Sequence, residues 1–336
     1  MATGTGAARF FTPRRLFALA FAASVFTWIM LLIGGTVNPT GSSLACKDWS
    51  FTWGFIPQCN GDAFPSMTNG VQFEHGHRLW GWLVGFTTTI IAIWGLVDKT
   101  LPKRTRVLAV VAVFLVLVQG ALGGITVLLK LDPIVSTGHL VLGYLFLAYM
   151  IHLTLRLQPT RRDDPAAGAR LQRGFVAFGF TLALAQVALG GAMRHYGAGM
   201  ICGDDWIGCG AEGFWPSLGL AKLHMTHRVM GYLVLIAAIW VSARARRRAV
   251  ADGRGFAARL AWVPGVLAVV QVVLGLLTVA TGKSVVIVAL HTAIGGLVLA
   301  SFATLFFAFG PLGDPAQRRP VAGPSEAPPR GLEAHA

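Results

Sequence analysis

The strongest constraint on the fold of this chain is a series of eight apolar stretches, each long enough to cross a lipid bilayer. Hydrophobic residues make up 54% of the 336 residues and charged residues only 12%, whereas a soluble domain carries about 25% charged residues. A membrane-spanning helix needs about 20 apolar residues. We therefore predict an all-α polytopic membrane protein with eight spans, at residues 16–37, 75–97, 106–129, 134–156, 174–194, 222–243, 259–281 and 284–309.

The positive charges are concentrated in alternate loops. Of the 28 lysines and arginines, all but seven fall on the side of the membrane that holds the N-terminus. Positively charged loops stay in the cytoplasm, so both termini are predicted to be cytoplasmic. The formal net charge of +14 therefore reflects topology and not a nucleic-acid partner. Residues 157–172 are predicted to be a cytoplasmic linker, and residues 311–336, rich in Pro, Ala, Gly and Arg, a disordered cytoplasmic tail.

An internal repeat divides the chain into two related halves. The segment 119–127 matches 271–279 at an offset of 152, and 77–84 matches 227–234 at an offset of 150. A Gly-Gly pair and a cysteine also recur, at an offset of 156. The repeat predicts two pseudo-symmetric four-helix bundles, residues 1–156 and 173–310, related by an axis along the membrane normal.

Four histidines occupy equivalent places in the two halves, each near the outer end of a predicted span: His77, His139, His227 and His291. One histidine in a membrane helix can simply hydrogen-bond to a neighbouring helix. Four of them, paired by the repeat, favour two metal centres, because intramembrane ionisable groups are costly and usually functional. Zinc is poorly supplied, since no cysteine or carboxylate set accompanies them. Haem needs one imidazole on each side of its iron and is the leading candidate.

Other residues could complete these haem sites. Glycines beside the histidines would let helices approach a macrocycle, although small residues also serve ordinary helix packing. In the first half we expect aromatic side chains to wall the ring: Trp80, Trp82, Phe86 and Phe146. Arg78 and Arg228 each follow a histidine and could bind haem propionates, or could extend to lipid phosphates. His75 and His195 are expected to be solvated at the outer interface.

Glu74 distinguishes the two halves. It precedes His77 by three residues and lies on the same side of the helix, and its counterpart in the second half is His224. Glu74 could simply pair with Arg78 one turn later. A carboxylate beside an apolar haem pocket could instead act as a general base. We therefore predict that the first half is reactive and that the second is structural or transfers electrons.

All four cysteines fall in outer loops: Cys46, Cys59, Cys202 and Cys209. This placement suits an oxidising compartment such as a bacterial periplasm and predicts one disulfide in each loop. A structural role is favoured, with a redox role for the first pair left open.

Taken together, these residues resemble the haem A synthase family, over about residues 15 to 310. The resemblance depends on the Glu-x-x-His-Arg motif at 74–78, His-Arg at 227–228, the lone His139 and His291, and the cysteine-bearing loops. It implies that His77 and His139 hold haem O as substrate, that His227 and His291 hold haem b, and that Glu74 is the essential acid. The twelve residues between Cys46 and Cys59 depart from the tighter spacing common in the family.

The resemblance implies an oxidoreductase of cytochrome oxidase assembly that converts the C8 methyl of haem O to a formyl group. It would work in the bacterial inner membrane, with its haem sites toward the outer face. Candidate partners are the farnesyltransferase that makes haem O and oxidase assembly factors. The alternatives are a non-catalytic dihaem electron carrier, which should have irons on opposite sides of the membrane, and a haem-transfer protein, which would not need Glu74.

Overall fold

The structure is a computed structural model that describes residues 12–52, 56–159, 169–217 and 219–308. Within these ranges eight helical segments are long and apolar enough to cross a membrane, as the sequence predicts. The first four are α2 (Pro13–Val37), α3 (Val71–Val97), α4 (Lys103–Leu128) and α5 (Pro133–Arg156). The next four are α6 (Ala169–His195), α7 (Gly219–Ala251), α8 with α9 (Gly255–Leu260 and Val263–Ala280) and α10 (Val285–Ala308).

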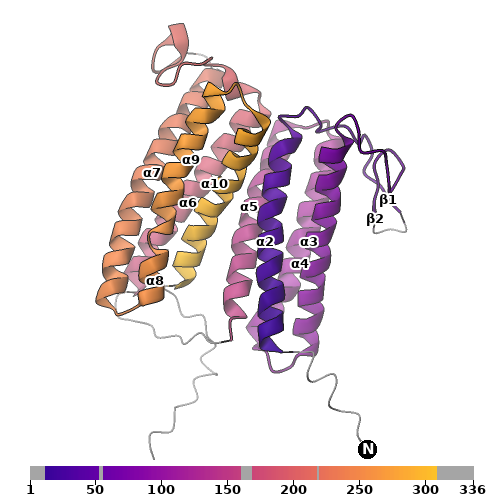
Figure 1. Cartoon of the computed structure of the whole chain (residues 1–336), viewed down its shortest axis with the longest axis vertical. Coiled ribbons are helices and arrows are strands. Elements are labelled where there is room, and N and C mark those ends of the chain that lie inside the picture. Colours follow the sequence, from indigo (N-terminus) through magenta and orange to yellow (C-terminus); the bar gives the residue numbers. More distant parts are fainter. Residues whose placement is uncertain (1–11, 53–55, 160–168, 218, 309–336) are drawn as a thin grey trace, which may run out of the picture.

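The spans form two neighbouring four-helix bundles (Figure 1). In the first bundle α2 packs on α3, α3 on α4, α4 on α5, and α5 returns to α2. The second bundle closes in the same way through α6, α7, α9 and α10. The short strands β1 (Phe51–Thr52) and β2 (Ile56–Pro57) form an antiparallel pair in the first outer loop. Two 3₁₀ turns, Ala198–Met200 and Gly210–Glu212, lie in the corresponding loop of the second bundle.

The contacts between the bundles come in equivalent pairs. Helix α2 contacts α10, α5 contacts α6, and α5 contacts α10. The first helix of each half thus meets the fourth helix of the other, which is the arrangement a two-fold relation would produce. Four hydrogen bonds between described residues cross this interface. Tyr144 Oη donates to the Thr292 carbonyl at 2.6 Å, and Trp28 Nε1 donates to the Ala293 carbonyl at 2.9 Å. Arg194 Nη2 donates to the Gly35 carbonyl at 3.4 Å, and Thr137 Oγ1 lies 3.2 Å from His195 Nδ1.

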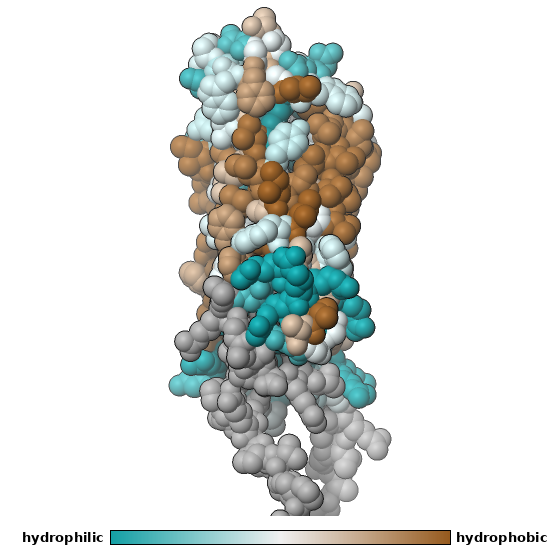
Figure 2. All heavy atoms as spheres, turned by 90° about the vertical axis from the view of Figure 1, so that its left-hand side faces the viewer, coloured by the Kyte–Doolittle hydropathy of each residue, from teal (hydrophilic) through white to brown (hydrophobic). Residues whose placement is uncertain are grey.

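The outer surface has an apolar belt. On the face shown in Figure 2, hydrophobic side chains occupy the middle of the bundle and hydrophilic side chains gather at both ends. The cysteine-bearing loops lie at one end, and α2 begins and α10 finishes at the other (Figure 1). The predicted tail at 311–336 and most of the predicted linker at 157–172 lie outside the described residues.

Two helix boundaries differ from the sequence-based expectation. Helix α7 continues to Ala251 rather than ending near residue 243, because its run of arginines and alanines has high helix propensity. The seventh span is not one continuous helix: Ala261 and Trp262 separate α8 from α9. Pro264 explains this break, since it lacks an N–H and its ring clashes with the carbonyl of the preceding turn.

At Gly35 the backbones of the two bundles approach closely, and its substitution should test their interface. A Cβ at this position would lie 2.9 Å from Ala289 Cα, a backbone atom that cannot rotate away. We expect Gly35→Ala to lower the free energy of unfolding by about 1–3 kcal/mol, measured by thermal unfolding in detergent. Gly85→Ala is the matched control, because nothing lies within 4 Å of its Cβ position. Equal stability of the two variants would contradict this packing.

Candidate functional site

The four histidines lie near the start of the helices that begin at the cysteine-loop end. His77 is on α3, His139 on α5, His227 on α7 and His291 on α10. Each belongs to the second helix of a helical hairpin, so every hairpin contributes one imidazole. All four imidazoles consequently lie toward one end of the bundles and not at opposite ends.

Each imidazole lies against a glycine of the preceding span. A Cβ at Gly34 would lie 2.9 Å from His77 Cε1, and one at Gly123 would lie 2.9 Å from His139 Cε1. The corresponding distances are 2.8 Å from Gly190 to His227 and 3.3 Å from Gly275 to His291. At such distances a larger residue would displace the ring. Glycine therefore allows each imidazole to lie directly on the neighbouring helix backbone.

The geometry of the first pair fits a bound metal. The ring centres of His77 and His139 are 6.5 Å apart. Two imidazoles that bind one metal ion from opposite sides have ring centres about 6.4 Å apart, because each metal–nitrogen bond is about 2 Å long. In all four histidines Nδ1 is buried and has no hydrogen-bond partner among the described residues.

The second pair lines a cavity of about 530 Å³, a volume typical of small-molecule and cofactor sites. His227 and His291 both contribute to its wall, together with glycines from the facing helices. Arg194 and Lys283 bring positive charge to the same cavity. The Nε atom of Arg194 is buried without a hydrogen-bond partner among the described residues. An apolar cavity with two imidazoles and two cationic side chains fits an iron macrocycle that carries acidic substituents.

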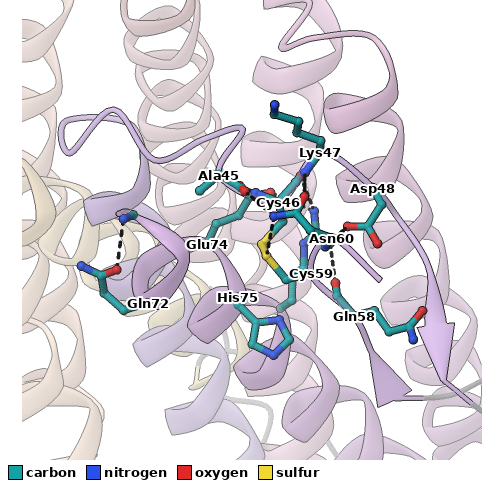
Figure 3. The surroundings of a disulfide bond; sticks show 12 residues. Ala45, Cys46, Lys47, Asp48, Gln58, Cys59, Asn60, Gln72, Glu74 and His75 are labelled. Carbon is teal, nitrogen blue, oxygen red and sulfur yellow. Dashed lines mark hydrogen bonds and ion pairs between the residues drawn. A yellow bond between two sulfur atoms is a disulfide. The ribbon is translucent and has the colours of Figure 1, made fainter. Parts of the chain in front are cut away.

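Glu74 ties helix α3 to the first disulfide loop (Figure 3). The residue as a whole is only 4% exposed. One carboxylate oxygen accepts a hydrogen bond from the Cys46 amide at 2.8 Å, and the other accepts one from Arg78 at 2.9 Å. Arg78 also donates to the carbonyls of Gln58 and Cys46. The pairing of Glu74 with Arg78 considered from the sequence is therefore present, and it also anchors the loop.

In the second half a histidine, and not a carboxylate, is the side-chain partner of the arginine that holds the loop. Arg228 donates to His224 Nε2 at 2.9 Å and to the carbonyls of Asp205 and Gly208. His224 Nδ1 lies 2.8 Å from the Ala198 carbonyl. The arginine that follows each proposed ligand thus holds an outer loop in both halves, and only the first half places an acid beside it.

Both loops contain the disulfide that the sequence predicts, Cys46–Cys59 and Cys202–Cys209. An aspartate organises each loop. Burial acts to raise the pKa of Asp48, but hydrogen bonds from the Ser50 hydroxyl and from loop amides outweigh it and lower that pKa. Three backbone amides, those of Gly208, Gly210 and Ile207, lower the pKa of Asp205. Both aspartates are therefore ionised at neutral pH and fix the loop backbone.

Two expectations about neighbouring residues are wrong. His75 is not solvated but fully buried, with Nε2 3.2 Å from the Ala63 carbonyl and its ring beside the Cys46–Cys59 disulfide. The loop folds over the start of α3 and covers it. Trp82 and Phe86 stack on each other but are 40% and 51% exposed. They lie on the outer face of α3 and cannot wall a haem, whereas Trp80 and Phe146 pack into the first bundle.

Comparison with known proteins identifies the family. A sequence profile described as cytochrome oxidase assembly protein matches residues 17–303. The chain belongs to the haem A synthase family. It is 28% identical over 242 residues to the heme A synthase of Alkalihalophilus pseudofirmus, covering 69% of this chain and 78% of that protein. It is 29% identical over 222 residues to the heme A synthase of Halalkalibacterium halodurans, covering 63% and 71% respectively.

Sequence reasoning did not assign a role to three glutamines of these hairpins. The side-chain amide Nε2 of Gln119 donates to the His139 carbonyl, that of Gln186 to the His227 carbonyl, and that of Gln271 to the His291 carbonyl, each at 2.9 Å. Each glutamine stands four residues before the glycine that faces the same histidine. A search for Gln-x-x-x-Gly would have found all three. Arg194 has no such signal, since its repeat counterpart is Asn38.

The buried Arg78–Glu74 pair should matter for stability. Its side chains are 11% and 6% exposed, and removing one partner of a buried pair leaves an uncompensated charge. We expect Arg78→Gln to lower the free energy of unfolding by about 3 kcal/mol, measured by thermal unfolding in detergent. In the double variant Arg78→Gln with Glu74→Gln, the free energy of unfolding should fall by less than the sum of the two single-variant losses.

Arg248→Gln is the matched control for this prediction. It breaks a pair of the same i,i+4 spacing with Asp252, in which the arginine side chain is 40% exposed. Exposed pairs contribute about 0–1 kcal/mol. A loss for Arg78→Gln no larger than that for Arg248→Gln would show that the buried pair does not hold the loop.

Proposed function

We propose that this chain is a haem A synthase that oxidises the C8 methyl of haem O to a formyl group. In this proposal His77 and His139 hold haem O, and His227 and His291 hold haem b. The observation that carries it is the pairing of imidazoles within a member of the haem A synthase family: one pair 6.5 Å apart, the other lining one cavity. Bound haem b would supply one-electron redox chemistry.

Glu74 is the residue we propose for proton transfer. Conversion of a methyl to a formyl group with oxygen from water releases four electrons and four protons. An external one-electron acceptor, reached through haem b, would take up the electrons, and a base near the substrate would take up the protons. Glu74 is one turn before His77 and is buried. It is already held by the Cys46 amide and by Arg78, so its carboxylate is fixed in place. The second half has His224 at this position, which supports a division into a reactive half and a haem b half.

The interface between the bundles supports electron transfer from one site to the other. Tyr144 lies on α5, five residues after His139, and its hydroxyl donates to the carbonyl of Thr292. Thr292 is adjacent to His291. The two proposed haem sites are thus connected by one helical segment and one short hydrogen bond, which suits haem b as a relay for electrons from the substrate.

We propose that the propionates of the second-half haem are bound by Arg228 and by the cavity residues Arg194 and Lys283. Arg228 retains a buried Nη2 without a hydrogen-bond partner among the described residues. Arg78 gives both of its Nη groups to loop carbonyls and to Glu74, so its direct contact with a propionate stays a prediction. We place the protein in the bacterial inner membrane with cytoplasmic termini and outward haem sites. The candidate partners are those of haem O supply and oxidase assembly.

The rival functions make different demands on the structure. A transmembrane electron carrier would benefit from haem sites at opposite ends of the bundles, whereas all four histidines lie toward one end. A haem-transfer protein would bind haem O without altering it and would place no demand on Glu74. The behaviour of Glu74 variants therefore separates catalysis from transfer.

Replacing Glu74 should stop the oxidation without removing haem. We expect Glu74→Gln and Glu74→His to lower conversion of haem O by about 100-fold or more, measured by chromatography of haems extracted from a host that makes haem O. Histidine is the natural occupant of this position in the second half, so it can still meet Arg78. Both variants should keep the haem absorbance of the wild type.

Glu212→Gln is the control, because this acid lies in the other outer loop and its carboxylate bonds only to Ser217 in the described residues. Loss of bound haem in both Glu74 variants would make Glu74 structural. Undiminished conversion would remove it from the mechanism.

The source of the inserted oxygen provides a separate test. Because His77 and His139 would both hold the substrate haem during the oxidation, we expect the inserted oxygen to come from water and not from dioxygen. Turnover in water enriched in oxygen-18 should label the hydroxymethyl product, identified by mass spectrometry. That species is the informative one, because an aldehyde oxygen exchanges with water. Label arriving from oxygen-18 dioxygen instead would exclude the water route.

A further inference from the structure

The four helical hairpins share one local arrangement around their histidines. Four residues after each histidine comes a glycine on the same helix: Gly81, Gly143, Gly231 and Gly295. In three hairpins a glutamine side chain from the preceding span lies on this glycine. Its Nε2 would be 3.1 Å from a Cβ at Gly143, 3.2 Å at Gly231 and 3.1 Å at Gly295. The glutamine thus reaches across the hairpin to donate to the histidine carbonyl.

The first hairpin has a methionine in place of the glutamine. Met30 precedes Gly34 by four residues, as the glutamines precede their glycines. Its terminal Cε would be 3.0 Å from a Cβ at Gly81, so it occupies the position that the amide nitrogen has elsewhere. A methyl group cannot donate a hydrogen bond. The carbonyl of His77 therefore lacks the amide contact that the other three histidine carbonyls receive.

The missing contact also changes the surroundings of the imidazole. In the second half the glutamine Nε2 lies 3.5 Å from His227 Nε2 and 3.3 Å from His291 Nε2. Each of these amides thus lies beside both the carbonyl and the ring of its histidine. Met30 offers His77 only a flexible thioether, and methionine adapts readily to changes in its neighbours.

The start of the helix adds a second, independent difference. Helix α5, which carries His139, begins with Asp132, whose carboxylate accepts hydrogen bonds from the Ile134 and Val135 amides. Helix α3 begins after Gly70, at a φ of 89°, and has no side-chain cap. Near its start α3 is instead held to the disulfide loop by Glu74 and Arg78. Of the two histidines of the first half, His77 is therefore the one without an amide contact to its carbonyl and without a side-chain cap on its helix, whereas His139 has both.

We propose that Met30 makes His77 the exchangeable ligand of the first-half haem. His77 is then the histidine that leaves the iron when haem O enters and when the product departs, while His139 stays bound. This inference builds on the proposed function, since a substrate haem must exchange and a resident haem b must not. In this inference Met30 is a positioning residue, and its presence distinguishes the substrate site from the cofactor site in two otherwise similar bundles.

The test measures how fast each haem leaves the protein. Purified protein from a host that makes haem O is mixed with excess apomyoglobin, and the haems remaining on the protein are extracted and separated by chromatography. Haem O and its oxidised products report on the first site, and haem b reports on the second. We expect Met30→Gln to slow loss from the first site about five-fold, as one added hydrogen bond would. Loss of haem b should not change.

Three matched variants complete the design. Met30→Leu lacks a donor and should behave as the wild type. Gln119→Met should accelerate loss from the first site, and Gln271→Met should accelerate loss of haem b. Carbon monoxide binding to the reduced first-site haem, which requires a ligand to leave, should slow in Met30→Gln by a similar factor.

The outcomes separate the two proposals. If the Met30→Gln protein keeps haem b but loses the first-site haem at the wild-type rate, Met30 does not control exchange. That result contradicts this inference and leaves the proposed function intact. If the wild type never carries haem O or its products, the proposed function falls as well. Faster loss in Met30→Leu than in the wild type would show that the thioether holds the site, which also contradicts the inference.

Discussion

The structure depends on the contact between each buried imidazole and a glycine of the preceding span. An imidazole in a membrane bundle needs a close, fixed environment. Glycine provides it because it has no side chain to fill the space: a Cβ added there would lie 2.8–3.3 Å from the imidazole Cε1. The contact sets the distance between the two helices of every hairpin. Repeating it four times places two pairs of imidazoles toward one end of the bundles.

Both halves use this scaffold, yet they differ in the residues that surround it. An arginine after the histidine holds a cysteine-bearing loop in each half, but its partner is Glu74 in one and His224 in the other. A glutamine contacts the histidine carbonyl in three hairpins, and Met30 takes its place in the fourth. Both exceptions fall on the same hairpin, that of His77. The His77 hairpin thus has an acid and lacks the glutamine, which fits the proposal that a substrate haem reacts there and must also be released.

The eight spans, the two disulfides and the family could be predicted from the sequence, because each follows from a local pattern or a repeat. The break between α8 and α9 was missed, although Pro264 signals it, because the hydrophobic run continues through it. The burial of His75 could not be predicted, since it depends on a loop that folds back over α3. Likewise Trp82 and Phe86 share the sequence neighbourhood of His77 but lie on the outer face of the helix. The role of the glutamines required the hairpin geometry, which brings residues of two spans together.

The central claim is that this scaffold oxidises haem O and does not merely carry haem. The most direct test is chromatography with mass analysis of haems extracted from membranes of a host that makes haem O, with and without this chain. The account predicts hydroxymethyl and formyl haem only when the chain is present. If the membranes contain folded, haem-loaded protein but only unchanged haem O and haem b, the claim is contradicted.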